Sequence, residues 1–163
     1  MADFEKAVAL VMASEGGAKF TDDPKDRGGK TRYGISKRRY PDEDIQNLTE
    51  ARARFLYKRD YWDRICGDSI IHQETAEVIF DTCVNFGVSA GSKLVQKILG
   101  VVVDGWIGPK TIAALNAVAQ PNDFLKSLAL MKISRYTMIC TKYREQQRFL
   151  MGWIKRALRG CQI

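Results

Sequence analysis

Apolar residues recur three and four positions apart along most of this chain, which is the spacing of α-helices that bury one face. The first such series follows Asp3, a suitable helix cap, and comprises Phe4, Ala7, Val8, Val11 and Met12. The most regular series comprises Ala76, Ile79, Phe80, Cys83 and Val84. Its helix is expected to end near Gly87. The pattern predicts a mainly α-helical protein.

Between these two helices the spacing changes. Residues 18–47 lose the helical period and gather Gly, Pro and Asp, which predicts loops and a short β-hairpin around "TRYGI". A further helix is expected to begin after Thr49, with Ala51, Phe55 and Trp62 on one side. The expected fold is therefore helical with a small hairpin region after the first helix.

The second half of the chain predicts a smaller helical unit. A short helix is expected to close at Gly100, and Pro109 is placed at the first position of the next one. Asn122 is a candidate cap for a long basic helix that runs to about Arg148, before a last helix over residues 150–158. No flexible linker separates the halves. We therefore expect two regions, 1–88 and 89–163, packed on a common core.

Charge is distributed unevenly. The formal net charge is +7, and from Lys126 onward nine Lys or Arg residues face a single acid, Glu145. Such a block favours a polyanionic partner, although solvated helix faces would carry the same residues.

No stretch approaches the roughly 20 apolar residues that a membrane span needs. The N-terminus also lacks the basic start of a standard secretory signal.

The cysteines and the single histidine exclude several kinds of site. The four cysteines have no metal-type spacing, so reduced thiols are expected, and Cys83 falls on an apolar helix face. His72 is the only histidine, which argues against a Ser-His-Asp triad or a multi-histidine metal site. We expect neither a metal nor a cofactor.

Glu15 is the first candidate catalytic residue. On a helical wheel it lies over Phe4 and Val8, at the centre of the apolar stripe. Desolvation there would raise the pKa of the carboxyl group, as general-acid cleavage of a glycosidic bond requires. Gly16 and Gly17 would cap the helix, and their missing side chains would also leave room for a bulky substrate.

The loop that follows offers partners for this carboxyl group. A second carboxylate could stabilise an oxocarbenium-like transition state or activate water, and a hydroxyl could hold that water. Asp22, Asp23 and Asp26 are the candidate carboxylates, and Thr31 is the candidate hydroxyl. Turn formation before Pro24 would equally explain the first two. The loop does not fit the EF-hand pattern of calcium sites.

Six motifs in order together resemble glycoside hydrolase family 108: "EGG", "DRGGKTRYGIS", "YKRDYWD", "FDTCVNFG", "VDGWIGPKT" and "GWIKR". The resemblance spans about Phe4 to Arg159 and implies a lysozyme-like N-acetylmuramidase, of the kind found as phage endolysins, with a C-terminal peptidoglycan-binding region. It implies cleavage of the β-1,4 bond between N-acetylmuramic acid and N-acetylglucosamine. It places the catalytic acid on Glu15 and the accompanying Asp and Thr on Asp26 and Thr31.

Sugars stack on aromatic rings and need hydrogen-bonding groups, so a glycan groove is expected to contain such residues. The candidates are Tyr33, Gly34, Tyr61, Trp62, Asn85 and Trp106. Packing in the core is the competing interpretation for each aromatic residue. The expected partner is bacterial peptidoglycan, bound by a monomer that is made in the bacterial cytoplasm and acts on the wall after release by a holin-type or other non-Sec route.

Three alternatives remain open from the sequence. A lytic transglycosylase could use the same glutamate as acid and then base, although an aspartate at position 26 argues mildly against it. A wall-binding module would give Glu15 no catalytic role. A nucleic-acid-binding helical protein would account for the basic C-terminal block but would leave the acidic loop unexplained.

Overall fold

The structure is a computed structural model that describes residues 1–14, 17–22 and 29–161. Its described residues form seven α-helices, α1 (Phe4–Ser14), α2 (Glu50–Tyr57), α3 (Gln73–Phe86), α4 (Val88–Leu99), α5 (Pro109–Asn116), α6 (Pro121–Lys142) and α7 (Leu150–Ala157). Two short strands, β1 (Thr31–Arg32) and β2 (Ile35–Ser36), pair antiparallel after the first helix. The predicted mainly α-helical fold with a small hairpin is confirmed.

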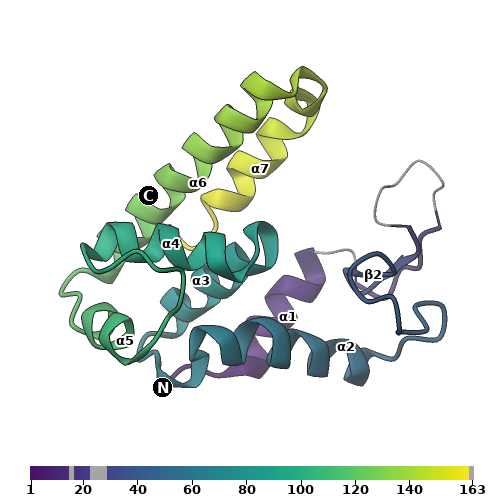
Figure 1. Ribbon diagram of the computed structural model, residues 1–163, viewed down its shortest axis with the longest axis horizontal. Helices are drawn as coiled ribbons and strands as arrows, with labels where there is room; N and C mark the ends of the chain where they lie inside the picture. Colours follow the sequence, from purple (N-terminus) through teal and green to yellow (C-terminus); the bar gives the residue numbers. More distant parts are fainter. Residues whose placement is uncertain (15–16, 23–28, 162–163) are drawn as a thin grey trace.

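The helices surround α3, which contacts α1, α4 and α6. α6 and α7 lie antiparallel and project from the body as a helical hairpin (Figure 1). The β1–β2 hairpin lies beyond the end of α1, on the side of the molecule opposite to α5 (Figure 1). The end of α1 therefore lies between the strand hairpin and the C-terminal helices.

One hydrophobic core joins the two halves of the chain. Its buried residues run from Ala2, just before α1, to Leu128 in α6. Aromatic rings form its centre: Trp62 is fully buried and packs edge-on against Phe80 at 5.6 Å between centroids. The expected common core is thus present. The boundary between regions 1–88 and 89–163 stays a prediction.

Helix termini follow the expected local chemistry at several points. The Asp3 carboxylate accepts from the Glu5 amide at 2.8 Å, and the Thr49 hydroxyl accepts from the Arg52 amide at 3.2 Å. Pro109 occupies the first turn of α5, as predicted. Only Gly87 separates α3 from α4, and its φ of 84° is a value that glycine adopts at little cost.

Three expectations about the helices were wrong, and the first concerns the buried face of the helix after Thr49. α2 buries Ala53, Leu56 and Tyr57 and leaves Phe55 about half exposed beneath the Arg52 and Arg59 side chains. Its period breaks at a five-residue π-helix over Lys58–Trp62, which rotates the following residues relative to an α-helix. Trp62 therefore does not share a face with Phe55.

The long basic helix also differs from expectation at both ends. Gln120, rather than Asn122, precedes its first turn, because Pro121 fixes the helical φ at the first position. α6 ends at Lys142, and a 3-10 helix over Arg144–Phe149 leads into α7. Tyr143 interrupts the helix with a φ of −130°.

Two further features complete the described fold. No helix among the described residues has the length and apolar character needed to cross a bilayer. The cysteines are free thiols, and Cys83 is buried on α3, as predicted. Burial raises the pKa of the Cys83 thiol to about 12, so this sulfur stays protonated and unreactive at neutral pH.

Candidate active site

The end of α1 is connected directly to the strand hairpin. The Gly17 amide donates to the Met12 carbonyl at 3.0 Å, and the Gly17 carbonyl accepts from the Tyr33 amide at 3.1 Å. Gly17 has a φ of 59°, the left-handed conformation expected of a glycine that caps a helix. Glu15 and Gly16 lie outside the described residues. Gly17, two positions after Glu15 in the sequence, is thus held against the hairpin turn.

The hairpin turn is unusual in its first residue. Tyr33 and Gly34 both have positive φ, 53° and 74°, which is the geometry of a two-residue type I′ turn. Such turns favour Asn or Asp followed by Gly, and a bulky residue at positive φ is a genuine outlier. The Tyr57 hydroxyl holds this conformation by donating to the Tyr33 carbonyl at 3.0 Å. A strained aromatic residue at a turn is a recognised feature of binding sites.

Thr31 lies at the base of the same hairpin. Its backbone exchanges two hydrogen bonds of 2.9 Å with Thr21, and its hydroxyl donates to the Gly29 carbonyl at 3.0 Å. Because its proton is already used, the hydroxyl is free to act as an acceptor. Asp22 is exposed and lies 4.0 Å from the Lys30 ammonium. Asp23 and Asp26 lie outside the described residues.

Tyr61 and Trp62 lie in the core, where the prediction placed them in a glycan groove. Trp62 is fully buried, and its indole donates to Asp68 at 2.7 Å. Tyr61 is only 4% exposed, and the Arg39 guanidinium lies 4.8 Å from its ring centroid. In this conformation neither ring offers a face to a sugar, which corrects that interpretation of both residues. The competing interpretation, core packing, is the one the structure supports.

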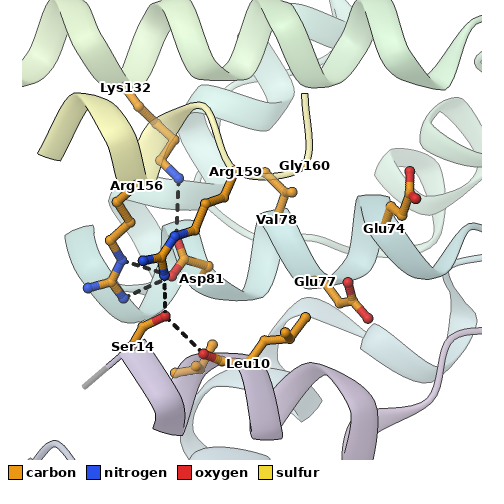
Figure 2. Close-up of a pocket in the computed structure, with 11 residues that line it drawn as sticks. Leu10, Ser14, Glu74, Glu77, Val78, Asp81, Lys132, Arg156, Arg159 and Gly160 are labelled. Carbon is orange, nitrogen blue, oxygen red and sulfur yellow. Dashed lines mark hydrogen bonds and ion pairs between the residues drawn. The ribbon is translucent and has the colours of Figure 1, made fainter. Parts of the chain in front are cut away.

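Asn85 bonds to Asp81, which lies in a cluster of charged side chains between the two halves of the chain. Its amide donates to the Asp81 carbonyl and, at 3.2 Å, to the Asp81 carboxylate. The same carboxylate accepts from Lys132 at 3.1 Å and from Arg156 at 2.8 and 3.0 Å. Figure 2 shows both cations converging on Asp81. Asn85 therefore belongs to a polar network that connects α3 with α6 and α7.

A cavity of about 360 Å³ adjoins this cluster and the end of α1. Leu10, Val11 and Ser14 contribute one wall from α1, and the other walls come from α3, α6, α7 and the residues after α7. Arg159 donates to the Ser14 hydroxyl at 2.6 Å, so the C-terminal segment contacts the last residue of α1 (Figure 2). Ser14, which directly precedes Glu15 in the sequence, thus lines the cavity.

Trp106 is exposed but lies away from the hairpin. It lies in the loop before α5, and α5 and the strand hairpin occupy opposite sides of the molecule (Figure 1). Buried Gln96 fixes this loop by bonding Asp104 at 2.7 Å, the Gly105 amide at 2.8 Å and the Trp106 carbonyl at 2.9 Å. The Trp106 residue is 60% exposed. It is a separate candidate platform for a sugar, on the second region.

The pKa of Asp104 makes this loop sensitive to acid. Hydrogen bonds from the Trp106 amide and from Gln96 hold the pKa of Asp104 below its usual range. The stabilisation is therefore complete above the unfolded-state pKa, about 4, and is lost as pH falls through the lower folded-state value. We expect Asp104→Asn to be less stable than wild type above pH ~4, with the gap closing at lower pH. Urea unfolding between pH 6 and pH 3 measures this; a gap independent of pH would contradict it.

Residues that the sequence did not single out contribute most to this geometry. Tyr57 supports the hairpin turn, and Asp81, Lys132 and Arg159 connect α3, α6 and the chain end to α1. The only local signal for Tyr57 was its spacing of four from Tyr61.

Among the described residues, no group of three or more His, Cys, Asp or Glu side chains is placed to hold a metal ion.

Comparisons with known proteins match two parts of the chain to different family models. Residues 8–87 match the family model of glycosyl hydrolase 108, and residues 90–158 match that of a predicted peptidoglycan domain. The chain is similar to a solved structure of Brucella abortus SagA, with 26% sequence identity, a TM-score of 0.74, and coverage of 98% of this chain and 96% of that one. No curated protein matches it.

The two matched regions meet at the end of α1. The first contains the helix that leads to Glu15, the strand hairpin and Asp81, and the second contains Lys132 and Arg156, which pair with Asp81. The cavity is therefore built by both regions together. Residues 8–87 belong to the glycosyl hydrolase 108 family, and the protein is a glycoside hydrolase that acts on peptidoglycan.

Proposed function

We propose that this enzyme is an N-acetylmuramidase that cleaves the β-1,4 bond between N-acetylmuramic acid and N-acetylglucosamine, with Glu15 as general acid. The observation that carries the proposal is the hydrogen bond of 3.1 Å between the Tyr33 amide and the Gly17 carbonyl. It holds the hairpin turn against Gly17, the last residue of the "EGG" motif. On this proposal, Glu15 and the "TRYG" motif belong to one site.

Each proposed catalytic residue has a defined task. Glu15 donates a proton to the glycosidic oxygen as the bond to the anomeric carbon breaks. Asp26 supplies the second carboxylate, which stabilises the positive charge that develops on the sugar ring or activates water. Thr31 accepts a hydrogen bond from the attacking water, because its own proton is directed at the Gly29 carbonyl.

Product analysis tests which bond is cleaved. Purified peptidoglycan is digested with the wild-type enzyme, and the new ends are identified by mass spectrometry. Reducing N-acetylmuramic acid ends are expected. Reducing N-acetylglucosamine ends would make the enzyme a glucosaminidase, and 1,6-anhydro-muramic ends would make it a lytic transglycosylase.

Tyr33 is proposed to stack on a sugar, which accounts for an aromatic residue in the turn. We expect Tyr33→Asn to lower kcat/KM about tenfold, since one ring contact contributes on the order of 1 kcal/mol. Asparagine accepts positive φ readily, so the turn itself is kept. Tyr33→Phe retains the ring and is expected to keep nearly full activity. An asparagine variant as active as wild type would exclude the stacking role.

Biologically, we propose a monomeric, bacteriolytic enzyme of the phage or prophage endolysin kind that reaches the wall after release from the cytoplasm. The match to a peptidoglycan domain and the resemblance to phage enzymes support this. Light scattering of the purified protein tests the monomer. A fall in turbidity of permeabilised bacterial cells tests lysis, and a stable suspension would contradict the bacteriolytic role.

A further inference from the structure

The cavity beside Ser14 separates its charges into two ends. Lys132, Arg156 and Arg159 gather around Asp81 at one end, and Glu74 and Glu77 lie toward the other (Figure 2). Lys132 and Arg156 bond to Asp81 at the first end, and two carboxylates form the second. Among the described residues, the charges that line the cavity are thus separated by sign.

The cationic end is built into the fold. Lys132 is 1% exposed, and its ammonium lies 3.1 Å from Asp81, which it shares with Arg156. Among the described residues, no carboxylate lies within ion-pair distance of Arg159, whose contact is the neutral Ser14 hydroxyl. The Arg159 guanidinium is therefore the group at this end with charge available for an anionic ligand group.

The anionic end lies on the same face of α3. Glu74, Glu77 and Asp81 are spaced by three and four residues, so they follow one another along the helix. The rise per residue separates the backbone positions of Glu74 and Asp81 by about 10 Å. The Glu77 carboxylate accepts from the Gln73 amide at 2.7 Å, and within the described ranges neither glutamate pairs with a cation. This end suits an ammonium group.

Apolar side chains line the cavity between the two ends. They come from Leu10, Val11 and Val78. A matching ligand carries an anionic group, an ammonium group and small apolar groups between them, over about 10 Å. A neutral glycan carries no charged groups that could pair with the two ends, and a polyanion would be repelled by Glu74 and Glu77.

We propose that this cavity binds the peptide stem that peptidoglycan carries on its muramic acid residues. Stem peptides combine carboxylates, the methyl groups of alanine and the amino group of a dibasic residue, which are the groups that the cavity complements. The cationic end comes largely from the matched peptidoglycan region and the anionic end from the hydrolase region. The second region thus takes part in substrate selection. This inference rests on the proposed muramidase function.

Kinetics on two substrates test the inference. The wild type and the Glu77→Gln and Arg159→Gln variants are compared on intact peptidoglycan and on glycan strands from which an amidase has removed the stems. Each variant is expected to raise KM about tenfold on intact peptidoglycan, the effect of one charge-assisted hydrogen bond, and to leave the kinetics on stem-free strands unchanged. Glu77→Gln keeps the oxygen that accepts from Gln73, so the fold is preserved.

Matched variants separate a stem site from a general charge effect. Lys110→Gln removes a positive charge from exposed α5 and is expected to change neither substrate. Arg159→Lys retains the charge and is expected to recover part of the loss. Equal changes on both substrates, or none on either, would overturn the stem site. Failure of the proposed function would instead be seen as wild-type enzyme that releases no reducing muramic ends from either substrate.

Discussion

Asp81→Asn is expected to lower the free energy of unfolding by about 3–5 kcal/mol, because it leaves the buried Lys132 ammonium without its counter-charge. Lys132 is 1% exposed, and Asp81 is the carboxylate to which its ammonium is bonded. Arg156 donates to the same carboxylate through two nitrogens. An asparagine keeps the shape and one acceptor but not the charge. Urea unfolding followed by circular dichroism measures the change.

A double variant shows whether the buried charge is the cause. Lys132→Met removes the ammonium and keeps a flexible apolar chain of similar length, so Asp81→Asn combined with Lys132→Met is expected to recover a large part of the loss. Asp123→Asn, on the exposed first turn of α6, serves as the control and is expected to change stability by less than about 0.5 kcal/mol. A loss below about 1 kcal/mol in Asp81→Asn would show that the network is not needed for the fold.

Glu15→Gln is expected to lower the rate of peptidoglycan cleavage by about 10²–10⁴-fold, the usual contribution of a general acid. Glutamine has nearly the same shape but cannot donate a proton to the leaving oxygen. Initial rates of reducing-end release measure the effect. Because the change removes a step of the reaction rather than a binding contact, the loss should be in kcat, with affinity for the wall largely retained.

A glutamate on the same helix provides the control for this substitution. Glu5 lies in the first turn of α1, where it pairs with Arg54 at 2.7 Å, far from the helix end that precedes Glu15. Exposed ion pairs contribute little to stability, so Glu5→Gln should keep activity within about twofold of wild type. A Glu15→Gln enzyme as active as Glu5→Gln would exclude Glu15 as the acid.

The helices could be predicted because their causes are local. The apolar stripe of α1, the caps at Asp3 and Thr49, and Pro109 at the start of α5 act within one or two turns. The hairpin followed from glycines and the loss of helical period. Prediction failed at the π-helix over Lys58–Trp62, where the period of the pattern itself changes.

The candidate site was less predictable because its contacts join distant positions. Asp81 meets Lys132 across 51 residues and Arg156 across 75, and nothing local to any of the three indicates the others. Tyr57 supports Tyr33 across 24 residues. Trp62 looked like a sugar platform, because an aromatic residue beside charges has the same local pattern whether its ring is exposed or buried. The apolar stripe indicated Glu15 and the loop offered its candidate partners, and the family resemblance then singled out Asp26 and Thr31.

Digestion in ¹⁸O-labelled water shows whether the enzyme hydrolyses the glycosidic bond at muramic acid. Wild-type enzyme is incubated with purified peptidoglycan, and the products are analysed by mass spectrometry immediately after reduction with borohydride. Hydrolysis at muramic acid places one ¹⁸O atom on the anomeric carbon of the new N-acetylmuramic acid end. Label on N-acetylglucosamine, or unlabelled anhydro-muramic ends, would contradict it.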